Sequence, residues 1–162
     1  MTALAPWLRA LGALVLIGLL AACGTSSQGQ PSSALGAAVA RMGEPRARYA
    51  LENGQRLFFV VRPGEVDSLD FDPSGQLTER RRALSQERFA ALAKRGGDAA
   101  SVQLEFGPPG RKLVLADGTG LQWTYSWREF DTWRLARVWF DKNSNFQRVE
   151  TVDDPGADDR YR

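Results

Sequence analysis

Apolar residues along this chain recur with two periods, one typical of helices and the other of strands. Three short segments carry an apolar residue every three or four positions, which predicts helices with one buried stripe. Capping residues bound two of them: Ser32 or Ser33 and Gly43 for the first, and Asp98 and Gly107 for the last. The predicted stripes are Leu35, Ala38, Val39 and Met42, then Phe89, Leu92 and Ala93 within 85–95, then Ala99, Val102 and Phe106.

Alternating apolar and polar residues predict antiparallel strands between and after these helices. The dipeptides Asn53-Gly54 and Asp117-Gly118 are typical of type I′ hairpin turns, in which two consecutive residues have positive φ. Two further turns are predicted at Asp72-Pro73-Ser74-Gly75 and Asp141-Lys142-Asn143-Ser144. The expected strands cover about 46–52, 55–62, 66–72 and 76–82, and then 111–116, 119–127, 133–141 and 145–152.

The alternation also assigns residues to the two faces of each sheet. One face carries the larger apolar residues and is predicted to form a core under the helices, and the other is predicted to lie away from that core. The core-facing set is Leu57, Phe59, Val61, Leu69 and Phe71 in the first half, and Leu121, Trp123, Tyr125, Val138 and Phe140 in the second. The opposite set is Val66, Ser68 and Asp70 in the first half, and Trp133, Leu135, Arg137 and Trp139 in the second.

The second half repeats the spacing of certain glycine, proline and apolar residues of the first. A shift of 64 residues places Gly43, Pro45, Leu51, Gly54 and Leu57 on Gly107, Pro109, Leu115, Gly118 and Leu121. A shift of 69 places Phe71-Asp72 on Phe140-Asp141, so we expect five extra residues, in a long loop over 126–134. We therefore predict an α+β fold of two tandem helix-plus-antiparallel-meander units, 34–84 and 85–152, packed as a two-layer sandwich and followed by a polar tail, 153–162.

Residues 1–22 are expected to be a signal peptide and not part of the fold. The uncharged apolar run over 10–22 is shorter than the roughly 20 residues that span a bilayer. It ends in Leu20-Ala21-Ala22-Cys23, which resembles the lipobox of bacterial lipoproteins. The resemblance implies cleavage between Ala22 and Cys23, with a diacylglyceryl group on the Cys23 thiol and an acyl chain, such as palmitate, on the new amino terminus.

Two further expectations follow from this lipobox. Gly24 in the position after the cysteine favours, by the sorting rule of the lipoproteins that it resembles, the outer membrane, with the folded part facing the periplasm. Residues 23–33 are rich in Gly, Ser and Thr and are predicted to be a flexible tether with a root-mean-square reach of about 17–19 Å.

Composition removes several classes of chemistry. The 162 residues include no histidine and one cysteine, so we expect no histidine-activated nucleophile, no internal disulfide and no metal centre built on histidine or several cysteines. A formal net charge of +2 does not indicate a nucleic-acid-binding protein. We expect no cofactor, no metal and no nucleic-acid partner.

A series of motifs over 85–152 has the order found in a known family. It consists of Phe89-x-x-Leu92, Asp98, Val102, Phe106-Gly107-Pro108-Pro109, Trp123, Tyr125, Val138-Trp139-Phe140-Asp141 and Phe146. This order is similar to that of the BamE (SmpA/OmlA) lipoproteins, whose α+β fold is shared by β-lactamase-inhibitor-type domains built from tandem units. The resemblance implies an outer-membrane lipoprotein that assists β-barrel protein assembly, or another scaffold of the envelope, and not an enzyme.

Four of the five tryptophans lie between residues 123 and 139. Trp123 and Trp127 are predicted to be core residues. Trp133 and Trp139 share the opposite face with Arg137, and tryptophan and arginine are the residue types enriched at binding hot spots. We therefore predict a partner-binding face at Trp133, Arg137 and Trp139, used either by a scaffold or, alternatively, by an inhibitor-like or ligand-binding lipoprotein that acts on a periplasmic enzyme.

Three aspartates are candidate catalytic groups. A pair among Asp70, Asp72 and Asp141 would serve as acid and base at a separation of about 5–10 Å. Asp72 and Asp141 each begin a predicted turn, where aspartate binds its own backbone, so we predict no catalytic residue. The basic run Arg80-Arg81-Arg82 is expected to be divided between the faces of a solvated edge strand, with anionic lipid as an alternative contact.

Overall fold

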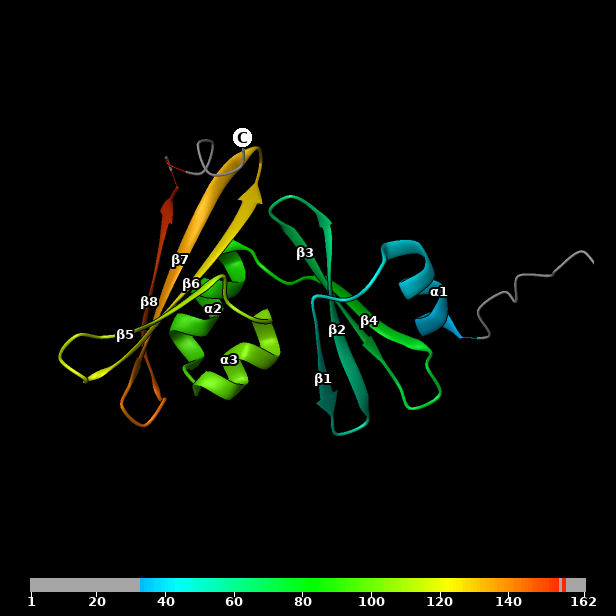
Figure 1. Ribbon diagram of the computed structural model, residues 1–162, viewed down its shortest axis with the longest axis horizontal. Coiled ribbons are helices and arrows are strands. Elements are labelled where there is room, and N and C mark those ends of the chain that lie inside the picture. Colours follow the sequence, from blue (N-terminus) through cyan, green and yellow to red (C-terminus); the bar gives the residue numbers. More distant parts are fainter. Residues whose placement is uncertain (1–32, 155, 157–162) are drawn as a thin grey trace, which may run out of the picture.

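The computed structural model describes residues 33–154 and 156 and shows an α+β fold with three helices and two four-stranded antiparallel sheets among those residues (Figure 1). The first sheet has the order β1-β2-β3-β4, and the second has the order β5-β6-β7-β8. The first half contains α1 (Ala34–Met42), β1 (Ala47–Leu51), β2 (Gly54–Arg62), β3 (Glu65–Phe71) and β4 (Leu77–Arg82). The second half contains α2 (Gln86–Arg95), α3 (Ala99–Phe106), β5 (Arg111–Val114), β6 (Gly120–Glu129), β7 (Thr132–Asp141) and β8 (Phe146–Asp153).

All three helices begin at capping residues, of which Ser33 and Asp98 are among those that the sequence predicts. The Ser33 and Ser85 hydroxyls accept hydrogen bonds from the backbone N–H groups of Gly36 and Arg88. The Asp98 carboxylate accepts one from the Ser101 N–H at 2.7 Å, and the Ser101 hydroxyl accepts one in return from the Asp98 N–H. These bonds satisfy N–H groups that have no partner within the helix, so each helix start is fixed locally.

The elements stack along the longest axis of the molecule in the order α1, first sheet, α2 with α3, second sheet (Figure 1). The stripe of α1 packs on one face of the first sheet, and the inner face of the second sheet packs on α2 and α3. The inner face of the second sheet includes Trp123 and Trp127, which are both buried as predicted. The α1 cluster is built on Ala38, Leu57, Phe59, Leu69 and Phe71.

The back of the first sheet is also buried. Val66, Ser68 and Asp70 lie on the face away from α1, as predicted, but a second core covers this face. These residues are 6%, 1% and 7% exposed. Phe58 and Val66 on this back face belong to the same core cluster as Phe89 and the inner face of the second sheet. Strand alternation distinguishes the two faces of a sheet but does not show whether the second face is covered as well.

The hairpins occur where they are predicted, but two turn types differ. Neither Asn53 nor Asp117 has a positive φ, so these are not type I′ turns. Gly54 is the first residue of β2 and has a φ of 130°. Gly118 has a φ of 67° and lies within a longer turn, in which its backbone N–H donates to the Leu115 carbonyl oxygen. Glycine supplies the positive φ in both, which the dipeptide signal indicates without fixing the loop length.

The expected loop over 126–134 is a hairpin instead. β6 and β7 pair without a break from Gly120 opposite Asp141 to Glu129 opposite Thr132. Only Phe130 and Asp131 remain as the turn, with φ values of 49° and 64°. The strand continues through the expected loop because Trp127 keeps the inward alternation and is buried against Phe89, 5.1 Å away between ring centroids.

The remaining expectations concern the chain ends. The predicted tail at 153–162 begins inside β8, which ends at Asp153, and the Asp154 N–H donates to the Trp133 carbonyl oxygen. The predicted signal peptide over 1–22, the lipid site at Cys23 and the tether up to residue 32 lie outside the described residues. Within the described part of the chain, no helix has both the length and the apolar character needed to cross a membrane.

Candidate functional site

The face of the second sheet that points away from α2 and α3 is the candidate site, and we call it the outer face (Figure 1). Its residues alternate with the buried inner ones along the two central strands, β6 and β7, and they are half-buried or exposed. Within residues 33–154 and 156, no helix or strand is packed over this face. The outer face is described below as cross-strand rows, because residues paired across neighbouring strands project from the same side of a sheet.

The central row of the outer face joins two arginines through a threonine. Thr124 of β6 is paired with Arg111 of β5 on one side and with Arg137 of β7 on the other. Arg137 is in turn paired with Glu150 of β8, and their side chains approach to 3.7 Å while remaining 41% and 48% exposed. This exposed ion pair is long, so it contributes little to stability.

A second row places Trp139 between polar neighbours. Trp139 is opposite Gln122 of β6 and Arg148 of β8, and Gln122 is opposite Leu113 of the edge strand β5. The Arg148 guanidinium carbon lies 3.8 Å from the centre of the Trp139 ring, so the two side chains stack. A cation over an aromatic face in a solvent-exposed setting contributes about 0.5–1 kcal/mol.

The sequence places Trp133 on this face too, and the structure gives it a partner inside the protein. Its ring packs over Gly64 in the turn between β2 and β3: a Cβ added at Gly64 would lie 2.7 Å from two ring atoms. The Gly64 carbonyl oxygen also accepts a hydrogen bond from the backbone N–H of Arg128, opposite Trp133. Trp133 therefore helps to hold the first sheet against the second, whereas Arg137 and Trp139 lie in the open part of the face.

A groove of about 390 Å³ runs along the outer face. Arg111 and Arg137 lie on its walls with Thr124 and Ser126 between them, and Leu135 provides apolar surface. Convergent polar groups beside apolar surface are typical of binding sites, although this volume is at the small end for a ligand pocket, about 300–1,000 Å³.

Phe130 at the tip of the β6–β7 hairpin is a candidate that the sequence analysis missed. Its side chain is 98% exposed, and both Phe130 and Asp131 have positive φ values. A phenylalanine in the left-handed region is strained, and Asn-Gly or Asp-Gly is the usual choice at such a turn. The signal that would have found it is an aromatic residue at the point where two long alternating strands meet.

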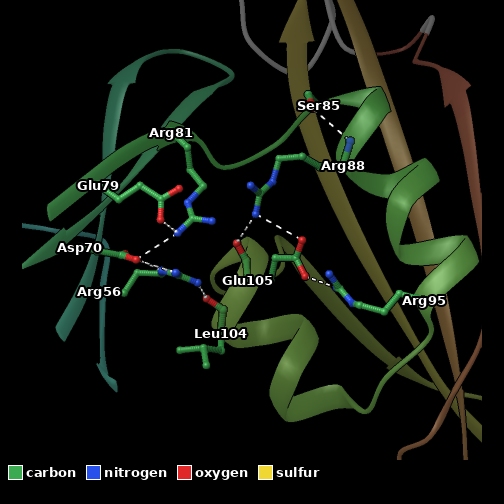
Figure 2. Close-up of polar contacts among 9 residues, drawn as sticks. All are labelled: Arg56, Asp70, Glu79, Arg81, Ser85, Arg88, Arg95, Leu104 and Glu105. Carbon is green, nitrogen blue, oxygen red and sulfur yellow. Dashed lines mark hydrogen bonds and ion pairs between the residues drawn. The ribbon is translucent and has the colours of Figure 1, made fainter. Parts of the chain in front are cut away.

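A buried ion-pair network lies between the first sheet and α3 (Figure 2). Arg56 of β2 makes a two-bond contact with the Asp70 carboxylate at 2.6 and 2.7 Å, and its remaining nitrogen donates to the Leu104 carbonyl oxygen. Arg81 of β4 donates to Asp70 at 3.0 Å and also to Glu79. Asp70, which was weighed as a catalytic group, is thus fully occupied by two guanidinium groups.

The electrostatic state of Asp70 follows from these contacts. Burial by itself would raise the pKa of the Asp70 carboxyl, but the hydrogen bonds from Arg56 and the charges of Arg56 and Arg81 outweigh it, so its pKa is lowered. The hydrogen bond to Asp70 in turn raises the pKa of Arg56. Both groups are therefore charged at neutral pH, and neither is suited to exchange protons with a substrate.

The network continues through the two helices (Figure 2). Arg88 of α2 donates to the backbone and the side chain of Glu105 in α3, and Glu105 also accepts from Arg95. Burial lowers the pKa of Arg88, and the nearby charges of Arg81 and Arg56 lower it further. Four arginines and three carboxylates thus link the first sheet, α2 and α3, and we assign this network a structural role.

The other charged residues weighed from the sequence also have structural partners. Arg80 and Arg82 bind the buried Asp67 carboxylate on the α1 side, while Arg81 points to the opposite side, so the basic run is divided between faces as predicted. Asp72 and Asp141 each accept backbone N–H groups from their own turns, also as predicted.

These turn bonds set the protonation of both aspartates. The hydrogen bond from the Ser74 side chain lowers the pKa of Asp72, and the backbone bond from Asn145 does the same for Asp141. Both groups are therefore ionised hydrogen-bond acceptors at neutral pH. Among the described residues, no group of three or more histidine, cysteine, aspartate or glutamate side chains is arranged to hold a metal ion.

In the comparisons with known proteins, no family model, no curated protein and no solved structure matches this chain. The function is therefore inferred from the lipobox-like sequence Leu20-Ala21-Ala22-Cys23 and from the geometry of the outer face. Of the residues assigned from the sequence, Trp133, Arg137 and Trp139 share the outer face, whereas Ala22 and Cys23 lie outside the described part of the chain.

Proposed function

We propose that this protein is a lipoprotein of the bacterial outer membrane, anchored through Cys23 and facing the periplasm, which works as a non-enzymatic protein-binding module through its outer face. A role as an accessory of β-barrel protein assembly is the particular function that the BamE-like motif order favours. The inhibitor-like alternative uses the same face on a periplasmic enzyme, so the identity of the partner distinguishes the two.

The observation that carries the proposal is the uncovered outer face at Trp139. An aromatic ring stacked with Arg148 beside a groove lined by two arginines combines large apolar area with directed hydrogen-bond donors. This is the chemistry of interface hot spots. The aspartates that an enzymatic function would need are instead bound to arginines or to turn backbones.

We further propose that the two halves are tandem copies of one ancestral unit. Gly54 and Gly120 each begin the second strand of their sheet, and a Cβ on either would lie about 2 Å from a carbonyl oxygen, that of Phe71 or Phe140. The register then makes Leu57 equivalent to Trp123 and Leu69 equivalent to Val138. The second strands of the two halves are therefore offset by 66 residues, a value between the offsets of 64 and 69 found in the sequence. The five extra residues of the second half are thus divided between its first two hairpins.

Replacing Trp139 with alanine is expected to abolish partner capture while the free energy of unfolding changes little. Trp139 is only half-buried, so its truncation removes few core contacts, whereas hot-spot residues carry 2 kcal/mol or more of binding, roughly a thirtyfold loss. The measurement is cross-linking in cells, affinity capture from detergent-solubilised envelope and mass spectrometry.

The matched control for Trp139→Ala is Leu77→Ala, which truncates a 45% exposed apolar residue on the first sheet. Capture of assembly-machinery components would support the accessory role, and capture of a periplasmic enzyme would support the inhibitor-like one. A Trp139→Ala protein that retains every partner and its fold would contradict the proposed site.

Replacing Cys23 with serine is expected to remove both acyl modification and membrane retention. The thiolate is the group that accepts the diacylglyceryl chain, and two or more chains are needed for firm anchoring at about 0.8 kcal/mol per buried CH₂. Intact-mass analysis of the purified protein together with cell fractionation measures both effects. A wild-type protein with a free thiol and residues 1–22 still attached would disprove the lipoprotein assignment.

A further inference from the structure

We propose that the outer face recognises an acidic segment of its partner protein, with one aspartate or glutamate carboxylate held between Arg111 and Arg137 and an adjacent apolar side chain placed on Trp139 or Leu135. The inference deepens the proposed function and rests on it, since both use the outer face. It adds the chemical class of the partner and the residues that select it.

The geometry of the central row suits one carboxylate. Neighbouring strands are about 4.8 Å apart, so Arg111 and Arg137, one on each side of Thr124, have Cα atoms roughly 10 Å apart. Arg111, Thr124 and Arg137 all line the groove, and the register places Thr124 between the two arginines. Two guanidinium groups reaching inward over that distance can bind the two oxygens of one carboxylate, which is the strong, charge-assisted form of hydrogen bond.

The two arginines are available for such a contact. Within residues 33–154 and 156, Arg111 forms no ion pair or side-chain hydrogen bond, and Arg137 has only the exposed 3.7 Å approach to Glu150. The buried or half-buried arginines at the centre of the fold differ: Arg56, Arg81 and Arg88 are each held by a carboxylate of the protein itself. An exposed guanidinium left without a carboxylate on a sheet face is what a partner carboxylate would complement.

The charge balance of the whole outer face points the same way. Its strand positions carry four arginines against two acidic residues, Glu150 and, at the end of β7, Asp141. The excess of two positive charges on this one face equals the formal net charge of the whole chain. Arg128 is partly neutralised by Asp131 at the hairpin tip, 3.2 Å away, which leaves Arg111, Arg137 and Arg148 as the basic centre. Complementary potentials of this kind steer encounters and reject partners of the wrong sign.

A protein segment fits the face better than a membrane surface. The basic row at Thr124 lies between apolar positions, with Trp139 in the row on one side and Leu135 in the row on the other. Such alternation of charge and apolar surface matches side chains along a peptide, whereas a layer of headgroups offers charge alone. The chain also enters the fold at α1, the end of the long axis opposite the outer face, so this face lies far from the point where the predicted tether joins the fold (Figure 1).

The test measures binding of two labelled octapeptides to the full-length protein in detergent by fluorescence anisotropy. One peptide alternates Glu with Leu, and the other alternates Gln with Leu. We expect the Glu peptide to bind at least about tenfold more tightly than the Gln peptide, and Arg111→Gln/Arg137→Gln to remove that preference, because charged hydrogen bonds contribute about 1.5–3 kcal/mol.

The matched control is Arg41→Gln/Lys94→Gln, which removes the same charge from exposed positions in the last turns of α1 and α2, and it should bind both peptides as the wild type does. Equal binding of the two peptides, or equal loss in both double variants, would overturn the inference. Sedimentation with phosphatidylglycerol vesicles that requires Arg111 and Arg137, without any peptide preference, would also overturn it by assigning the face to anionic lipid.

The same variants separate this inference from the proposed function. If Trp139→Ala loses the captured partner and Arg111→Gln/Arg137→Gln keeps it, the outer face binds protein but not through a carboxylate, and only the acidic-segment inference fails. If neither variant affects capture, the proposed binding face itself is wrong. Loss of capture in both variants, together with the peptide preference, supports both proposals.

Discussion

Replacing Asp70 with asparagine is expected to lower the free energy of unfolding by about 3–5 kcal/mol, because removing one partner of a buried ion pair leaves an uncompensated charge. The Asp70 and Arg56 side chains are 9% and 12% exposed, and Arg56 spans from β2 to the Leu104 carbonyl oxygen of α3. The asparagine variant would leave Arg56 and Arg81 facing each other without the carboxylate that holds both. Urea unfolding followed by tryptophan fluorescence measures the loss.

Two further variants serve as comparisons for Asp70→Asn. Asp153→Asn breaks a carboxylate–arginine pair of the same type with Arg134, but Asp153 is 67% exposed, so we expect a cost below about 1 kcal/mol. Arg56→Met combined with Asp70→Asn removes the unpaired charge and should be no less stable than Asp70→Asn alone. A single Asp70→Asn variant as stable as Asp153→Asn would contradict the assignment of this network to fold stability.

The stabilisation from Asp70 is expected to disappear in acid. Its pKa is lowered in the folded protein, so the contribution is fully present above the unfolded value of about 3.9 and is lost as the pH falls through the folded pKa. The measurement is the difference in urea midpoint between wild type and Asp70→Asn at a series of pH values. The difference should be constant near neutrality and should shrink below about pH 4. A constant difference down to pH 2 would disprove the assignment.

The local elements of this fold could be predicted from the sequence because their signals are local. Ser33 and Asp98 cap helices through bonds within three residues, and inward alternation correctly placed Trp123 and Tyr125. The burial of the back face of the first sheet could not be predicted in this way, because it depends on α2 and α3, which are distant in sequence. Ser68 and Asp70 have the polar character of surface residues, and partners contributed by other strands and helices make their burial possible.

The candidate site, like the fold, could be predicted only in part from the sequence. Alternation placed Arg137 and Trp139 on one face, which the structure leaves open, but it could not show that Trp133 covers Gly64 of the first sheet. Arg111 was missed because it belongs to a four-residue strand whose residues are all exposed, and such a strand shows no alternation in burial. Its importance comes from the register, which places it opposite Thr124 and in the same cross-strand row as Arg137.

Replacing Phe130-Asp131 with Asn-Gly is expected to raise the free energy of unfolding by about 1–2 kcal/mol, although it removes a large apolar side chain. Both residues have positive φ values, which cost roughly 1–2 kcal/mol each for an ordinary side chain and little for glycine or asparagine. The Phe130 ring is 98% exposed, so no buried area is lost when it is removed. The Arg128–Asp131 ion pair that is also lost is exposed and contributes little. Relief of backbone strain therefore sets the sign of the change, and urea unfolding measures it.

The same substitution tests why a strained, exposed ring stands at the end of the outer face. A residue that is unfavourable for the fold in both backbone and exposure indicates a role outside the fold, and strain of this kind clusters at functional sites. We expect Phe130→Asn/Asp131→Gly to bind the captured partner less tightly despite its higher stability. Phe130→Ala is the matched control, because it removes the ring but keeps the strain; it should lose the same affinity without the gain in stability. Full binding by Phe130→Ala would restrict the interface to the strands around Arg137 and Trp139.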